Sequence, residues 1–144
     1  MKVLVLDSNN VDEMMPMINK NECFIKFWMD GCGHCENMHH DWEELKQELS
    51  NKHNNANIAI VDVDSNAASQ MDLGRSILGY PTIMHTRNGK EVSKYNGPRK
   101  TKQLKEWILR TANSIKTSNS KKTKRKKSRV KKGKKKKQTK KYKR

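Results

Sequence analysis

Residues 28–35 read Trp-Met-Asp-Gly-Cys-Gly-His-Cys, and at this stretch an apolar strand pattern ends and a helical pattern begins. Two residues separate Cys32 from Cys35, so the pair can close a small disulfide ring. A cysteine on the first turn of a helix lies over unpaired backbone N–H groups and the positive end of the helix dipole. Both effects favour the thiolate, so Cys32 is predicted to ionise easily and to act as a nucleophile.

The patterns on either side of this junction predict a buried strand followed by an amphipathic helix. Residues 23–29 are apolar except for Lys26, which is typical of a strand covered on both faces and therefore central in a parallel sheet. After the cysteines, apolar residues recur at helical spacing and predict a helix to about Lys52. These apolar residues are Met38, Trp42, Leu45 and Leu49.

Shorter patterns predict the remaining elements. They are a strand at 2–6, a helix near 11–18 that Pro16 kinks or shortens, a strand at 56–63, a helix at 66–73 ended by Gly74, a strand at 78–84, a strand at 91–95 and a helix from about Thr101. Asp62 and Asp64 are interpreted as the exit of the 56–63 strand. Asn88-Gly89 predicts a tight hairpin. The order predicts an α/β fold, with a mixed central sheet and helices on both faces.

The net charge of +17 is not spread evenly along the chain. Residues 1–115 carry 14 Lys and Arg against 15 Asp and Glu, whereas residues 116–144 carry 18 Lys and Arg and no acid. This contrast predicts a folded domain at 1–115 and a disordered basic tail at 116–144. So dense a positive charge binds nucleic acid or other polyanions by counterion release, without base preference, and similar clusters direct proteins to the nucleus.

The sequence composition also indicates in which cellular compartment to expect the protein. No run approaches the roughly 18 apolar residues of a membrane helix, and the apolar start at residues 2–6 is too short for a signal peptide. We therefore expect no membrane association and a location in the cytoplasm or nucleus. Three cysteines are too few for a disulfide scaffold, and a close pair in a reducing compartment is typical of catalysis or metal binding.

The metal alternative is a zinc site in which His34, His39 or His40 joins the cysteine pair. Such a site normally needs a second clustered pair, and only Cys23 remains, inside the predicted buried strand. We therefore predict no metal, and we interpret Cys23 as a small core residue.

Three landmarks occur in order along the chain. Phe27-Trp28 leads into Cys32-Gly33-His34-Cys35, Tyr80-Pro81-Thr82 follows about 45 residues later, and Tyr-Asn-Gly-Pro-Arg at 95–99 precedes the last helix. Over residues 1–115 this pattern resembles the thioredoxin superfamily, and within it the redox-active domain of protein disulfide isomerase. The Gly-His dipeptide resembles the isomerase branch, because thioredoxins usually carry Gly-Pro there.

The resemblance implies a thioredoxin fold and a role for each cysteine. Cys32 would be the attacking thiolate and Cys35 the resolving thiol. Between them, Gly33 and His34 complete the motif, and an imidazolium at His34 would stabilise the Cys32 thiolate and hence the reduced form. The domain would then favour oxidation and isomerisation of its substrates.

The resemblance also assigns supporting residues. Pro81 would be a cis-proline facing the cysteines, and Tyr80 and Trp28 would help to line the substrate site. Arg99 matches the arginine that eases ionisation of the second cysteine.

Four positions depart from the family pattern. One is His40, which stands where relatives carry a helix-kinking proline, so we expect a straighter helix after the cysteines. Gly31 and Asp30 replace the usual Trp and Pro before the first cysteine, so we expect a barer active-site lip with an added negative charge. Lys26 stands where relatives carry the buried acid that takes the proton of the second cysteine. Proton transfer would therefore run through water, Asp30 or a neutral Lys26.

Together these observations predict a monomeric thiol-disulfide oxidoreductase or isomerase that needs no cofactor beyond its redox-active Cys32–Cys35 disulfide. Its partners would be protein thiols and disulfides, an external electron donor or acceptor, and a polyanion bound by residues 116–144. An isomerase-like motif without a signal peptide fits a cytoplasmic disulfide-forming system, such as those at the assembly sites of large DNA viruses or in their virions. The alternative is a non-catalytic thioredoxin-fold body that carries a nucleic-acid-binding or targeting tail.

Overall fold

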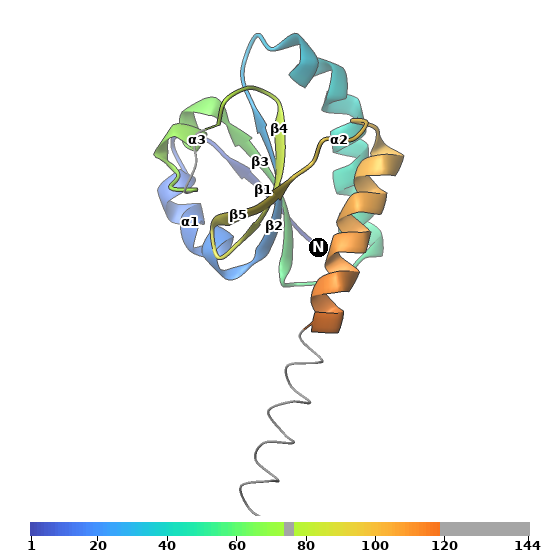
Figure 1. The fold of residues 1–144 in the computed structure, drawn as a ribbon. Helices are drawn as coiled ribbons and strands as arrows, with labels where there is room; N and C mark the ends of the chain where they lie inside the picture. The colour runs from blue at the N-terminus through green and yellow to red at the C-terminus, as the bar shows by residue number, and fades with distance from the viewer. Residues whose placement is uncertain (74–76, 119–144) are drawn as a thin grey trace, which may run out of the picture. The chain divides into compact units, whose positions relative to one another are not determined.

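A five-stranded mixed sheet forms the centre of the computed structural model, which describes residues 1–73 and 77–118 (Figure 1). Its strands are β1 (Lys2–Leu6), β2 (Glu22–Trp28), β3 (Ile58–Asp64), β4 (Thr82–Arg87) and β5 (Lys90–Lys94). They lie in the order β1-β3-β2-β4-β5. The first three are parallel, whereas β4 is antiparallel to β2 and β5 is antiparallel to β4. The predicted mixed sheet is therefore confirmed.

Helices cover both faces of this sheet. The helices are α1 (Val11–Lys20), α2 (Gly33–Lys52), α3 (Ser65–Gln70) and a C-terminal helix at residues 101–118. Figure 1 shows α1 and α3 on one face, and α2 beside the start of the C-terminal helix on the other. Residues 1–108 form one compact unit. The expected α/β fold with helices on both faces is confirmed.

The central strand β2 distributes its side chains to both faces. Cys23, Ile25 and Phe27 belong to the buried cluster formed with α1 and α3. Phe24 and Lys26 point to the other face, where Phe24 stacks on His85 and Lys26 lies 5.7 Å from the centre of the Trp42 ring. Because successive side chains of a strand alternate between faces, a strand buried on both sides must be apolar almost throughout.

Several predicted boundaries differ from the observed ones, and three of the differences have a local reason. The strand predicted at 56–63 begins at Ile58, because residues 55–57 form a turn in which Ile58 N–H donates to the carbonyl of Asn55. The helix predicted at 66–73 spans Ser65–Gln70, since Asp64 caps its start and Met71 turns extended. The strand predicted at 78–84 begins at Thr82, after Pro81, which has no N–H to donate to the ladder.

Two other local predictions, the short first helix and the Asn88-Gly89 turn, are confirmed. The helix α1 is short, ten residues, and runs through Pro16. Asn88 and Gly89 both adopt positive φ in the turn between β4 and β5. No helix in the described part of the chain is long and apolar enough to cross a membrane.

Part of the sequence lies outside the described residues. Gly74, the predicted helix stop, is one such residue, and the predicted basic tail lies outside them from residue 119 onward. The division at residue 115 and the disorder of the tail stay predictions.

Leu45 anchors α2 to the sheet, and its side chain is fully buried. Replacing Leu45 with Ala should lower the free energy of unfolding by about 2–5 kcal/mol, because the change removes buried methyl groups and leaves a cavity. Gln47→Ala on the exposed side of the same helix is the matched control and should change it by less than about 0.5 kcal/mol. Urea denaturation measures both values, and equal effects would contradict the assigned orientation of α2.

Cys23 is fully buried in β2, and burial raises the pKa of its thiol to about 12. A thiol with a raised pKa stays protonated below that value, so Cys23 should resist alkylation even near the ordinary thiol pKa of about 8.5. The test uses a Cys32→Ser, Cys35→Ser variant, in which Cys23 is the remaining thiol. Mass spectrometry should find slow iodoacetamide labelling of the native protein and fast labelling in denaturant. Equal rates would show that Cys23 is accessible.

Candidate active site

A disulfide joins Cys32 and Cys35 at the N-terminus of α2, with 5.2 Å between the two Cα atoms. Cys32 is the N-cap residue of this helix, and its Sγ accepts a hydrogen bond from the backbone N–H of Cys35 at 3.2 Å. The Cys32 side chain is partly exposed, whereas Cys35 is 6% exposed. After reduction, the helix dipole and the Cys35 N–H would therefore stabilise a thiolate at the more accessible sulfur.

A second segment approaches this disulfide from the entrance to β4. The Tyr80–Pro81 peptide bond is cis, as the family resemblance implied, and the Tyr80 carbonyl oxygen lies 3.6 Å from Cys32 Sγ. The chain thus brings backbone polar groups next to the accessible sulfur from 48 residues away. Those groups are available to an extended peptide that approaches Cys32.

The loop before Cys32 has a backbone that suits the glycine found there. Gly31 adopts φ +73°, a conformation that residues with a Cβ rarely adopt. Its neighbours Met29 and Asp30 are both exposed. Gly31 therefore gives the loop before Cys32 a backbone conformation that a residue with a Cβ would adopt only with strain.

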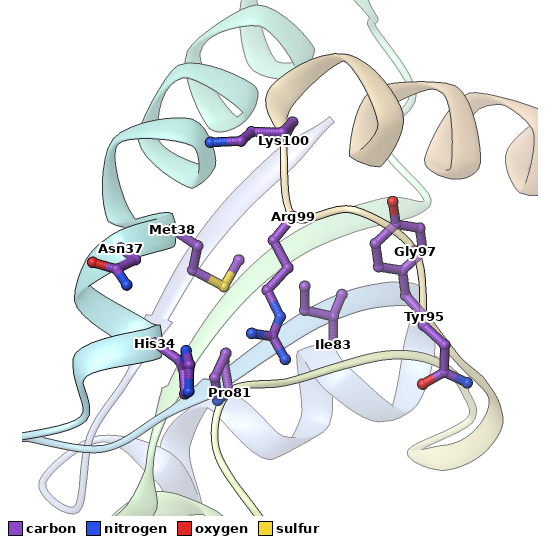
Figure 2. Close-up of a pocket in the computed structure, with 10 residues that line it drawn as sticks. His34, Asn37, Met38, Pro81, Ile83, Tyr95, Gly97, Arg99 and Lys100 are labelled. Atoms are coloured by element: carbon purple, nitrogen blue, oxygen red, sulfur yellow. The ribbon is translucent and has the colours of Figure 1, made fainter.

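One cavity, of about 470 Å³, lies on the Pro81 side of the motif; we call it the His34–Arg99 cavity. It is lined by His34, Asn37, Met38, Pro81, Ile83, Tyr95, Asn96, Gly97, Arg99 and Lys100. Figure 2 shows the Arg99 side chain reaching toward Pro81 and His34. The fold therefore brings together His34, Pro81 and Arg99 from the three separate landmarks of the sequence.

A second cavity, of about 360 Å³, lies on the other side of the motif; we call it the Cys35–Asp62 cavity. Cys35 and Trp28 line it together with the exposed Asp30. Lys26 and Asp62 also line this cavity. The less accessible cysteine therefore shares a cavity with a buried acid and a buried base.

Asp62 is the centre of a buried ionic cluster. Its Oδ1 lies 3.3 Å from Lys26 Nζ, and its Oδ2 accepts a hydrogen bond from Lys46 Nζ at 2.6 Å. Burial acts to lower the pKa of Lys46, but hydrogen bonds to Asp62 and Glu43 outweigh burial and raise it. Side-chain exposures of 5% for Lys26 and 8% for Asp62 keep water from screening the pair.

Asp62 is the residue that sequence reasoning missed. It was interpreted as the exit of a strand, but it lies inside β3 and is the register partner of Lys26 in β2. Lys26 in the sequence was the signal for Asp62, because a lysine inside a buried strand requires a nearby anion. Asp62 also adds a carboxylate to the three routes for proton transfer that the sequence suggested.

The arrangement of the cysteines and histidines can be compared with what a zinc site would require. Cys32 and Cys35 are joined to each other, so neither offers a thiolate ligand in this state. Over residues 1–73 and 77–118, no three His, Cys, Asp or Glu side chains cluster closely enough to hold a metal ion. His34 lines the His34–Arg99 cavity, whereas His39 lines the Cys35–Asp62 cavity.

Comparisons with curated proteins find relatives with the same kind of domain. Thioredoxin domain-containing protein 5 homolog of Drosophila melanogaster is 31% identical over 97 residues, which is 67% of this chain and 23% of that protein. Protein disulfide-isomerase 1 of Caenorhabditis elegans is 32% identical over 117 residues, which is 81% of this chain and 23% of that protein. The chain thus spans less than a quarter of the length of either relative.

Solved structures show the same fold. The zinc-bound form of human ERp44 matches with a TM-score of 0.62 and 27% identity, over 76% of this chain and 31% of that one. The family model Thioredoxin matches residues 2–110. With a disulfide at the start of α2 and a cis-proline beside it, the fold and this match agree that the chain belongs to the thioredoxin family.

Proposed function

We propose that this domain is a thiol-disulfide oxidoreductase that acts on protein thiols and disulfides through Cys32 and Cys35. The observation that carries the proposal is the Cys32–Cys35 disulfide at the N-terminus of α2, with the accessible sulfur beside the Tyr80 carbonyl. Relatives named protein disulfide-isomerase support it, because their similarity covers this domain.

The reaction starts from the disulfide form. A substrate thiolate attacks Cys32 Sγ, the Cys32–Cys35 bond breaks, and Cys35 leaves as a thiolate that takes up a proton. A second substrate thiolate then attacks the substrate sulfur of the mixed disulfide and releases the Cys32 thiolate. Two electrons pass from the substrate dithiol to the cysteine pair. The same steps in reverse reduce a substrate disulfide, and Cys35 then resolves the mixed disulfide.

His34 favours the oxidising direction. Its side chain is exposed on the first turn of α2, two residues after Cys32. An imidazolium there stabilises the Cys32 thiolate and so the reduced form of the pair. Thioredoxin and protein disulfide isomerase differ by about 90 mV, roughly 4 kcal/mol for two electrons, and we place this domain nearer the isomerase.

Asp62 is proposed as the group that exchanges a proton with Cys35. It lines the same cavity as Cys35, and its Oδ1 accepts no hydrogen bond from a described residue. In relatives of this fold a buried acid of the central strand has that role, whereas here Lys26 occupies β2 and the carboxylate comes from β3. A carboxylate thus lines the same cavity as the proposed resolving cysteine, although it comes from a different strand.

Replacing Cys35 with Ala should trap substrates on Cys32, because the resolving thiol is gone while the attacking thiolate remains. The variant, isolated from cells and run on non-reducing gels, should carry mixed disulfides that dithiothreitol removes. A Cys32→Ala, Cys35→Ala variant is the control and should carry none. The absence of adducts, together with no insulin disulfide reduction by the parent chain, would contradict the proposed function.

Asp62→Asn should slow the resolution of a mixed disulfide by about 10²-fold or more, the usual contribution of a positioned acid or base. The change also leaves the buried Lys26 ammonium group without its carboxylate and should lower stability by about 3–5 kcal/mol. A variant with Lys26→Asp and Asp62→Lys separates these effects, because it restores the ion pair with the carboxylate on β2. Stopped-flow kinetics should show that the exchanged pair recovers most of the rate. A folded Asp62→Asn variant with parental kinetics would remove Asp62 from the mechanism.

A further inference from the structure

The His34–Arg99 cavity adjoins the site where a substrate cysteine would react. His34 belongs to the motif itself, and Pro81 follows the Tyr80 carbonyl that lies 3.6 Å from Cys32 Sγ. A peptide joined to Cys32 through sulfur therefore places its neighbouring residues at the rim of this cavity. The side chains that line the cavity can contact those residues and so discriminate between substrates.

The lining of this cavity is cationic. Arg99 and Lys100 supply the positive charge, and none of the ten lining residues is Asp or Glu. Asp41 is a nearby acid, but it already accepts hydrogen bonds from Thr101 N–H and Thr101 Oγ1, each at 3.0 Å. The Thr101 N–H holds the pKa of Asp41 below its ordinary value. Lys100 Nζ lies 3.9 Å from the other oxygen of Asp41 and is 71% exposed in its side chain.

Of the two lining residues with a permanent positive charge, Lys100 lies near Asp41, whereas Arg99 has no partner among the described residues. Within residues 1–73 and 77–118 its guanidinium makes no hydrogen bond and no ion pair, and Figure 2 shows it directed toward Pro81. A guanidinium binds a carboxylate through two parallel hydrogen bonds, which a planar group held in place can form well. The charge and the direction of Arg99 therefore suit a carboxylate that arrives beside Cys32.

The loop that presents Arg99 is held in a defined conformation. Tyr95 OH donates a hydrogen bond to the Pro98 carbonyl at 2.6 Å, and the Tyr95 ring packs on Trp107 with 5.0 Å between centroids. A Cβ at Gly97 would lie 2.6 Å from Tyr95 OH, so this close approach requires glycine. The backbone before Arg99 is therefore fixed by contacts within residues 95–107.

We infer that the His34–Arg99 cavity selects protein substrates in which an acidic side chain adjoins the reacting cysteine, with the carboxylate bound by Arg99. This inference rests on the proposed function, since it specifies the substrates of the same cysteine pair. The basic residues of 116–144 also attract acidic peptides, but they are the same in every variant, so they do not contribute to a difference between variants.

The test measures Cys32 reactivity in a Cys35→Ala background, which removes any influence of Arg99 on Cys35. The probes are two peptides that carry a cysteine activated with neutral 2-thiopyridine and differ only in the next residue, Glu or Gln. Release of pyridine-2-thione reports the rate of mixed-disulfide formation. We expect the Glu peptide to react roughly two- to fivefold faster, the upper part of the range for one exposed ion pair.

Arg99→Gln should reduce this Glu-to-Gln ratio nearly to one, and Arg99→Lys should keep part of it, because the charge stays while the planar fork is lost. The matched control is Lys20→Gln, which removes one positive charge from the last turn of α1, before the first residue of β2, and should leave the ratio unchanged. The ratio cancels changes in Cys32 nucleophilicity, so it reports substrate selection alone.

A ratio near one in the Cys35→Ala background, or a ratio that Arg99→Gln leaves unchanged, would overturn the inference. Failure of both peptides to react would instead overturn the proposed function, since Cys32 would then not be a nucleophile. The two failures are therefore distinct.

Discussion

The placement of Cys32 depends on the burial of β2 on both of its faces. Ile25 and Phe27 pack with α1 and α3, while Phe24 packs against His85 and Trp107 on the other face. A strand held on both sides has no freedom to change register, because a shift of one residue would move every side chain to the opposite face. The end of β2 is therefore fixed, and the short loop that follows delivers Cys32 to the start of α2.

The same burial explains the ionic cluster beneath the disulfide. Lys26 alternates onto the α2 face of β2, where a lone ammonium group would be costly, and Asp62 on the neighbouring strand neutralises it. Lys46 links the carboxylate to α2. One side chain thus connects two strands with the helix that carries both active-site cysteines. Removing one member of such a cluster costs more stability than the cluster contributes, since it leaves a buried charge unpaired.

The two cavities beside the disulfide differ in chemistry. The Cys35–Asp62 cavity is lined by Cys35 and by the buried carboxylate, so it suits the proton exchange proposed for them. The His34–Arg99 cavity opens beside Pro81 and is lined by cations without an acid, so it suits substrate recognition. Proton exchange and substrate recognition can therefore occur on opposite sides of one sulfur pair.

The sequence by itself determined the order of the elements, the helix start at the cysteines and the hairpin at Asn88-Gly89, because these depend on local periodicity and turn chemistry. It also determined the cysteine pair and the three landmarks around it. Only the tertiary structure decided that Asp62 pairs with Lys26 and that Arg99 reaches toward His34 and Pro81. Those contacts join residues from separate elements, so they depend on strand register and loop path, which no local pattern encodes.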